Sequence, residues 1–330
     1  MSTGENAPRR ALGFFPTPLI ELPRLSARLG GPRLLMKRDD QSGLALGGNK
    51  TRKLEYLVGA ALAEGCDTLV TGGAAQSNHC RQTAAAASAC GLACHLVLGG
   101  EPPAEPAGNL LLDDLLGAVV HWAGPHRKGE TIPELVAELR RAGRRPYLIP
   151  YGGSSTVGAL GFVAAVAELK SQLAPLGEIS HIVFPSSSGG TQAGLMVGAR
   201  RHGLSAALVG IGIDKGEAGE GPFDDHVLRL ANETARLLGM DGNFERGEVI
   251  VNPGYVGAGY GVVGELERRA IRLTAETEGI LLDPVYTGRA MGGLIDLIAR
   301  GAFTRQQTVL FWHTGGSPAL FAYGGALLSE

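Results

Sequence analysis

The chain has few aromatic residues and almost no net charge. Phenylalanine, tryptophan and tyrosine make up only 5% of the 330 residues, so leucine, valine, isoleucine and alanine must form most of the core. The formal net charge of −2 disfavours a nucleic acid or an anionic membrane as a partner. No apolar run reaches the roughly 18 residues of a membrane-spanning helix. Residues 1–10 are polar, so we expect no signal peptide and predict a cytoplasmic protein.

Cysteine is also scarce, and its spacing excludes the common zinc patterns. The four cysteines are Cys66, Cys80, Cys90 and Cys94. None of them forms the C-x-x-C pair that is typical of structural zinc sites. We therefore expect reduced thiols and predict no metal site.

Glycine, in contrast, is abundant, and it often follows a strand or helix pattern. The chain has 51 glycines without a collagen period, which indicates many tight turns. Short apolar runs that alternate with helical patterns predict βαβ units and parallel sheets. The expected strands are 33–37, 67–71, 93–98, 118–122, 146–149, 181–185, 207–213 and 308–311. The expected helices are 53–64, 78–90, 110–116, 132–142, 158–173, 192–202, 225–238 and 264–278.

Lys50 lies in the segment GGNKTRK (residues 47–53), directly before an amphipathic helical pattern. The two glycines allow a ligand to approach the backbone closely. The positive end of a helix dipole lowers the pKa of a neighbouring ammonium group and favours the neutral amine. Schiff-base chemistry requires that neutral amine. Taken alone, however, a lysine in such a segment is more often a solvated surface residue.

Three polar turns follow predicted strands, at the edge where ligands of open α/β sheets collect. The first, at residues 73–79, offers Ser77 and Asn78 at a helix start, where N–H groups can bind a carboxylate. Either residue could instead only cap the helix. The second, SSSGGT at residues 186–191, is a nest of donors suited to a phosphate, but it is neither a Walker loop nor a GxGxxG motif. The third is HTGGS at residues 313–317.

A lysine, a carboxylate-sized anion site and a phosphate-sized anion site together fit pyridoxal 5′-phosphate with an amino-acid substrate. Other assemblies of these parts stay open from the residues alone. A non-catalytic binding protein for a small anion is the alternative from a different class. Such a binder has no need of a Schiff-base lysine, which favours the enzyme.

Four motifs resemble those of the D-cysteine desulfhydrase/1-aminocyclopropane-1-carboxylate deaminase family, a branch of the fold-type II (tryptophan-synthase-β-like) pyridoxal phosphate enzymes. They are GGNKTRK at 47–53, QSNH at 76–79, DPVYTG at 283–288 and HTGG at 313–316. The resemblance spans residues 15–323. It implies an α/β fold with two domains, each a mainly parallel twisted sheet flanked by helices, with the cofactor between them. The implied large domain is 1–51 with 158–330, and the small inserted domain is 52–157.

The same resemblance assigns roles to individual residues and implies a homodimer. Lys50 would carry the cofactor as a Schiff base and move the Cα proton. Cofactor contacts are implied for Lys50, Asn49, Ser187, Ser188, Gly189, Gly190, Thr191, Thr287 and Thr314. Substrate contacts are implied for Gln76, Ser77, Asn78, Tyr260 and Tyr286. Ser77 and the two tyrosines are also candidate catalytic residues beside Lys50, although either tyrosine could be a core ring with a satisfied hydroxyl.

The implied reaction is β-elimination on a small amino acid, with D-cysteine as the first choice, giving pyruvate, sulfide and ammonia. L-Cysteine, L-cysteate and β-chloroalanine are alternative substrates, and deamination of 1-aminocyclopropane-1-carboxylate is an alternative reaction. Deaminases of the family carry glutamate after the DPVY tyrosine, where this chain has Thr287. A hydroxyl there would leave the ring nitrogen unprotonated, and this weaker electron sink suits loss of a thiolate better than carbon–carbon cleavage.

Overall fold

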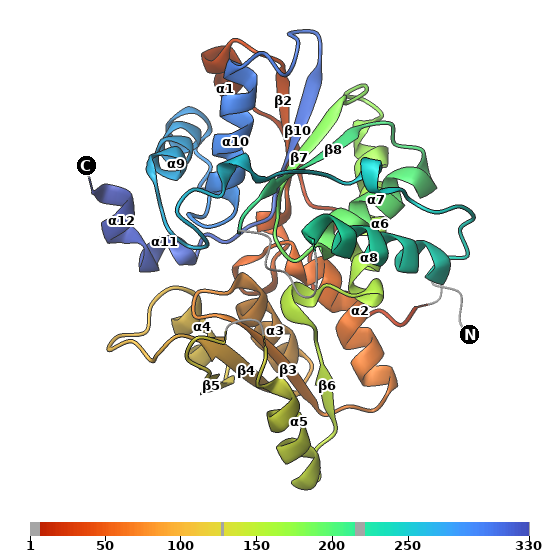
Figure 1. Cartoon of the computed structure of the whole chain (residues 1–330), viewed down its shortest axis with the longest axis vertical. Helices are drawn as coiled ribbons and strands as arrows, with labels where there is room; N and C mark the ends of the chain where they lie inside the picture. The colour runs from red at the N-terminus through yellow and green to blue at the C-terminus, as the bar shows by residue number, and fades with distance from the viewer. Residues whose placement is uncertain (1–6, 127–128, 215–221, 330) are drawn as a thin grey trace.

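The computed structural model describes residues 7–126, 129–214 and 222–329, and its strands form two sheets (Figure 1). The six-stranded sheet has the order β1-β2-β10-β7-β8-β9, and the four-stranded sheet has the order β5-β4-β3-β6. Within the described ranges, every pairing between these strands is parallel except that of β1 with β2. The predicted α/β fold class, with parallel-rich sheets flanked by helices, is therefore confirmed. No helix in the described ranges is long and apolar enough to cross a membrane.

The six-stranded sheet lies in the upper part of Figure 1 and has helices on both faces. Its strands are β1 (Leu19–Glu21), β2 (Arg33–Arg38), β7 (His181–Ser186), β8 (Ala207–Gly212), β9 (Ile250–Asn252) and β10 (Thr308–His313). The helices beside it are α1 (Pro23–Leu29), α6 (Thr156–Leu173), α7 (Gly190–His202), α8 (Phe223–Leu237), α9 (Glu265–Glu278) and α10 (Thr287–Ala299), followed by α11 (Ala319–Ala322) and α12 (Gly324–Leu328). Leu310 and Trp312 of β10 pack in the core with α6, α7 and α8, whereas Val309 and Phe311 pack with α1, α9 and α10. This alternation is expected for a central strand that is buried on both faces.

The four-stranded sheet lies below it in Figure 1 and comes from one continuous part of the chain. Its strands are β3 (Thr68–Ala74), β4 (Ala93–Gly99), β5 (Val119–Trp122) and β6 (Pro146–Leu148). Helices α2 (Lys50–Ala63), α3 (Asn78–Ala89) and α4 (Asn109–Leu115) share one core with this sheet, and α5 (Ile132–Arg141) packs in another. The domain boundaries expected at residues 51/52 and 157/158 stay a prediction.

Most expected elements are present within a few residues of their predicted ends, but helix α10 was not predicted. Its sequence contains three glycines, which lower helix propensity. Close packing explains all three, and a Cβ on Gly288 would lie 2.7 Å from the carbonyl oxygen of Asp283. A Cβ on Gly292 would lie 2.6 Å from a side-chain carbon of Leu266, and one on Gly293 would lie 3.0 Å from the ring of Tyr255. Tertiary contact therefore outweighs local propensity in this helix.

Helix α2 begins at Lys50, three residues before its predicted start, and packs closely against α6. A Cβ on Gly161 of α6 would lie only 2.2 Å from the carbonyl oxygen of Arg52, so a side chain at this position has no room. The short distance between the helices lets the Arg52 guanidinium reach Glu168 of α6. The closest approach of these two groups is 2.9 Å.

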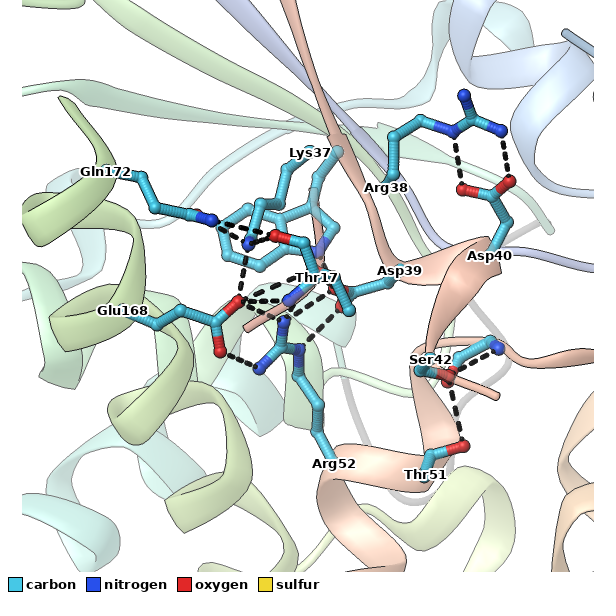
Figure 2. Close-up of polar contacts among 12 residues, drawn as sticks. Thr17, Lys37, Arg38, Asp39, Asp40, Ser42, Thr51, Arg52, Glu168 and Gln172 are labelled. Atoms are coloured by element: carbon cyan, nitrogen blue, oxygen red, sulfur yellow. Dashed lines mark hydrogen bonds and ion pairs between the residues drawn. The ribbon is translucent and has the colours of Figure 1, made fainter. Parts of the chain in front are cut away.

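Arg52 belongs to a buried ion network of Lys37, Asp39, Arg52 and Glu168, drawn in Figure 2. The Arg52 guanidinium donates to both oxygens of Asp39, at 2.8 and 2.9 Å, and Lys37 donates to Glu168. The indole of Trp312 donates to Asp39 at 2.8 Å. The network joins α2, α6, β2 and β10, so it fixes α2 against the six-stranded sheet.

Candidate active site

A cavity lies where strands of both sheets end, and it is lined by ten of the predicted site residues. They are Asn49, Lys50, Ser77, Asn78, Ser187, Ser188, Gly189, Thr191, Tyr286 and Thr314. Each of the three predicted polar turns contributes to this lining. Two hydrogen bonds connect Asn49, which precedes Lys50, to the second and third of these turns. Asn49 Nδ2 donates to Thr191 Oγ1 at 3.1 Å, and Asn49 N donates to Thr314 O at 2.9 Å.

Four predicted residues lie outside the lining and have other partners. The Gln76 amide donates to Ala107 O and accepts from Asn109 N, both at 2.9 Å. The Tyr260 hydroxyl lies 2.5 Å from that of Tyr286, which does line the cavity.

The other two of these residues are Gly190 and Thr287. Gly190 N donates to Ser154 Oγ at 3.1 Å. Thr287 Oγ1 donates to a carboxylate oxygen of Asp283 and accepts from Asp283 N, each at 2.7 Å. Of the two hydroxyls predicted near the ring nitrogen, only that of Thr314 therefore belongs to a residue of the cavity wall.

Lys50 is the first residue of α2, and its amine has an unusual environment. Desolvation by the surrounding protein lowers the pKa of Lys50 to about 8. The sequence predicted a lower pKa from the helix dipole, and the structure adds burial as the physical cause. Within the described residues, no carboxylate pairs with this ammonium group. A substantial neutral fraction at physiological pH follows, as a Schiff-base lysine requires.

Lys53, one turn further along α2, is not part of the cavity lining but lies beside the Ser/Gly turn, and sequence reasoning did not single it out. It is fully buried, and its ammonium donates to Gly152 O at 3.1 Å and to Ser154 Oγ at 3.3 Å. Burial and the nearby charge of Lys50 hold the pKa of Lys53 well below its usual value. The spacing of three residues, which puts both lysines on one helix face, was the available signal.

The Ser/Gly turn at residues 187–190 opens helix α7 beside Lys53. Gly189 precedes the helix with φ of 81°, a left-handed conformation that favours glycine. A Cβ on Gly190 would lie 3.0 Å from Lys53 Nζ, and one on Gly152 would lie 2.3 Å from Ser188 Oγ. Small residues thus leave space among hydroxyl, backbone N–H and ammonium donors. This donor set suits a phosphate.

The turn before α3 supplies another part of the cavity wall. Ser77 Oγ accepts from Cys80 N at 3.2 Å, so Ser77 caps the helix, as one of the two alternatives predicted. Asn78 accepts from Asn109 through its side-chain oxygen at 2.8 Å. Both residues still line the cavity, so capping and a cavity position are combined in this turn.

Tyr286 faces the same cavity and is held by Tyr260. The two rings meet edge to face, with centroids 5.9 Å apart. Burial, with the neighbouring Tyr260, raises the pKa of Tyr286 well above its ordinary value. The Tyr286 phenol therefore stays protonated at neutral pH and can act as a hydrogen-bond donor.

Comparison with known families decides the class of protein. Residues 11–315 match the model of the family described as pyridoxal-phosphate dependent enzyme. The chain belongs to this family. The predicted cofactor and the prediction of an enzyme are therefore confirmed.

Relatives within the pyridoxal-phosphate dependent enzymes agree with the resemblance seen in the motifs. The chain is 44% identical over 322 residues to a protein of Klebsiella pneumoniae (strain 342) named D-cysteine desulfhydrase, covering 96% of each chain. It is 42% identical over 323 residues to a protein of the same name from Salmonella choleraesuis (strain SC-B67), again covering 96% of each.

Solved structures of other proteins have the same fold. A structure described as an ACC deaminase homologue superimposes with a TM-score of 0.90 at 38% identity, covering 98% of this chain and 96% of that one. A fungal L-serine ammonia-lyase from Rhizomucor miehei has a TM-score of 0.64 at 17% identity, covering 94% and 96%, and shares the fold.

The cavity fits the cofactor of this family. Lys53 is a buried amine whose hydrogen-bond partners in the described residues are neutral, and a phosphate in the adjoining turn would favour its charged form. Lys50 lines the cavity itself and can provide the amine for the aldehyde. The residues present therefore match the aldehyde and the phosphate of pyridoxal 5′-phosphate.

Proposed function

We propose that this chain catalyses β-elimination from D-cysteine, releasing sulfide and leading to pyruvate and ammonia. One observation carries the proposal: a single cavity contains the Lys50 amine, a phosphate-sized nest and a turn that can hold a carboxylate. The names of the relatives that are 42–44% identical over 96% of the chain support D-cysteine as the substrate.

The residues of the cavity would divide the work as follows. Ser187, Ser188, Thr191 and Lys53 would hold the cofactor phosphate, and Gly189 would leave room for it. Asn49 and Thr314 would hold the ring. When bound, pyridoxal 5′-phosphate supplies an electron sink that acidifies the substrate Cα–H.

The Lys50 amine would accept the Cα proton, since a pKa of about 8 keeps part of it neutral. Ser77 and Asn78 would orient the substrate through its carboxylate. The Tyr286 hydroxyl, kept protonated by its raised pKa and held by Tyr260, would donate a hydrogen bond to the departing sulfur, which leaves as its anion. Thr287, hydrogen-bonded to Asp283, would hold the segment that carries Tyr286 without contacting the ligand. Gln76, which accepts from Asn109 N, would stabilise the Ser77/Asn78 turn.

Product analysis on the purified holoenzyme tests the proposal. We expect pyruvate and sulfide from D-cysteine at a higher kcat/KM than from L-cysteine, L-cysteate or β-chloroalanine. We also expect little 2-oxobutyrate from 1-aminocyclopropane-1-carboxylate, the compound to which the name of the ACC deaminase homologue refers. Faster 2-oxobutyrate than pyruvate formation would replace the lyase with the deaminase. A holoenzyme that turns over none of these compounds would favour the small-anion binding protein.

We also propose the inserted domain at residues 52–157 and a homodimer. The continuous origin of the four-stranded sheet supports the first, and the family resemblance supports the second. Light scattering after size-exclusion chromatography measures the assembly, and a mass near 34.2 kDa would contradict the dimer. The cytoplasmic location stays a prediction.

A further inference from the structure

Three buried side chains form a hydrogen-bonded chain that ends at the carboxylate turn. Arg81 Nε donates to Asn109 Oδ1 at 2.8 Å, and Asn109 Nδ2 donates to Asn78 Oδ1 at 2.8 Å. Asn109 Nδ2 also donates to Gln76 O at 2.9 Å. Arg81 and Asn109 are fully buried, and Asn78 is 7% exposed, so water does not compete freely for these groups.

The direction of every bond in this chain follows from the arginine. A guanidinium has donors and no acceptor, so it requires the oxygen of the Asn109 amide. The Asn109 nitrogen must then point the other way, where it meets Asn78 and the acceptor-only Gln76 carbonyl. Asn78 must in turn direct its oxygen to Asn109. An amide can ordinarily be turned by 180° with little change in shape. Here the Arg81 guanidinium fixes the orientation of two amides, those of Asn109 and Asn78.

The remaining end of the Asn78 amide is its nitrogen, and Asn78 is part of the cavity lining. A Cβ on Gly316, in the turn whose Thr314 also lines the cavity, would lie 2.8 Å from Asn78 Nδ2. Among the described residues, this NH2 group has no hydrogen-bond acceptor. A ligand that carries only acceptors, such as a carboxylate, is the natural partner for it.

Hydrogen bonds to the backbone hold the Arg81 guanidinium in place, and so maintain the orientation of the two amides. Its two terminal nitrogens donate to the carbonyls of Ala45 and, at 3.0 Å, of Gly47. Ala45 and Leu46 are non-glycine residues with φ of 41° and 69°, in the left-handed region. The unusual backbone directs these carbonyls at the guanidinium. The same arginine thus holds the segment that leads into Lys50.

We propose that Arg81 and Asn109 are positioning residues that fix the Asn78 amide with its N–H groups toward the cavity, so that the turn selects a carboxylate over an amide. This inference rests on the proposed function only in placing the amino-acid carboxylate at the Ser77/Asn78 turn. Neither residue touches the substrate. They determine whether the substrate meets the nitrogen or the oxygen of the Asn78 amide.

Binding of glycine and glycinamide to the holoenzyme tests the inference without turnover. Both ligands are achiral and lack a leaving group, and their binding is followed by the change in the visible absorbance of the cofactor. In Asn109→Ser, which removes the donor to Asn78 without adding charge, the preference for glycine over glycinamide should fall at least tenfold. Asn109→Ala serves as the second neutral variant if the serine variant is unstable. The unchanged spectrum of the ligand-free holoenzyme checks that Lys50 and the cofactor are in place.

Two further variants separate the possible causes. Asn109→Asp keeps an acceptor for Arg81 but adds a negative charge, and it should lower the glycine preference at least as much. Asn232→Ser removes a comparable side-chain amide in α8, which bonds to the backbone of Phe244, and it should leave the preference within twofold of wild type.

An effect in the aspartate variant alone would mean simple charge repulsion and would overturn the inference. An equal loss of both ligands, with the ratio unchanged, would also overturn it. The proposed reaction can fail independently of this inference. A protein that discriminates glycine from glycinamide but releases no sulfide from D-cysteine would support the positioning role of Arg81 and Asn109 and would contradict D-cysteine as the substrate.

Discussion

Helix α2 carries basic side chains on two sides, and in the described residues only one side is paired with carboxylates. Burial alone would lower the pKa of Arg52, but Asp39 and Glu168 more than offset this and raise it. Lys50 and Lys53 have no carboxylate partner in the described part of the chain, and burial lowers the pKa of both. A fully paired buried charge serves the fold, whereas an unpaired one needs a ligand to complete it. The same helix therefore joins a structural side to a reactive side.

Removal of the Lys50 amine should have the largest effect on the reactive side. Lys50→Ala removes both the covalent anchor and the proton acceptor, so kcat/KM for D-cysteine should fall by about 10⁴-fold or more. The absorbance band of the lysine-bound cofactor should disappear, while the unfolding free energy stays close to wild type. The exposed Lys170, which bonds to His202 O and Gly203 O, provides the control Lys170→Ala. Sulfide release by Lys50→Ala near the wild-type rate would contradict its assignment.

The structural side should instead respond in stability. Glu168→Gln leaves Lys37 and Arg52 short of one carboxylate, and loss of one partner from a buried network costs about 3–5 kcal/mol. Urea unfolding of the holoenzyme measures this cost. Glu21→Gln breaks an exposed pair with Arg33 and should cost less than about 1 kcal/mol. Equal losses in the two variants would show that the buried network adds nothing special.

Lys53 offers a sharper test of the unpaired side, because its substitution should affect the cofactor and not the fold. Lys53→Met keeps most of the side-chain volume and removes the charge. Loss of a hydrogen bond to a charged group, worth roughly 1.5–3 kcal/mol, should raise the Kd for pyridoxal 5′-phosphate about 10- to 150-fold. Equilibrium dialysis of the cofactor measures it. The apoenzyme should be as stable as wild type or more so, since a buried polar amine is removed. An unchanged Kd would remove Lys53 from the phosphate site.

A change in pH should have the smallest effect, on the unfolding free energy that the structural side contributes through Glu168. Burial would raise the pKa of Glu168, but Arg52 and Lys37 outweigh it and lower the pKa to about 2. The unfolded chain, with an ordinary glutamate pKa, binds this proton first as the pH falls. The contribution is therefore complete above about pH 5 and is lost toward pH 2. Between pH 5 and 3 the wild type should lose about 1–2 kcal/mol more unfolding free energy than Glu168→Gln. Parallel curves for the two proteins would contradict the coupling.

The sequence predicted those parts of the fold and site that depend on local patterns. The strand–helix alternation and the polar turns after strands needed only neighbouring residues, and the structure brings these turns to one cavity. The Asn78–Asn109 contact joins residues 31 positions apart, so no local pattern could reveal it.

Thr287 shows a different limit of sequence reasoning. It was expected at the cofactor, but its hydroxyl and backbone N–H both bond to Asp283, four residues earlier. Short polar side chains often bond locally in this way at helix starts. The DPVYT spacing was therefore also readable as the start of helix α10.

The close contact of Gly161 with Arg52 O limits how the sequence can vary. Alanine, the smallest replacement, already brings an atom to 2.2 Å from a backbone oxygen. In a library randomised at this position, selection for a folded protein should retain glycine. Leu46, which is 62% exposed, is free of such packing, although its left-handed backbone would favour asparagine or glycine there. At these two positions, the distance from the new side chain to the nearest backbone atom decides which residues can be accepted.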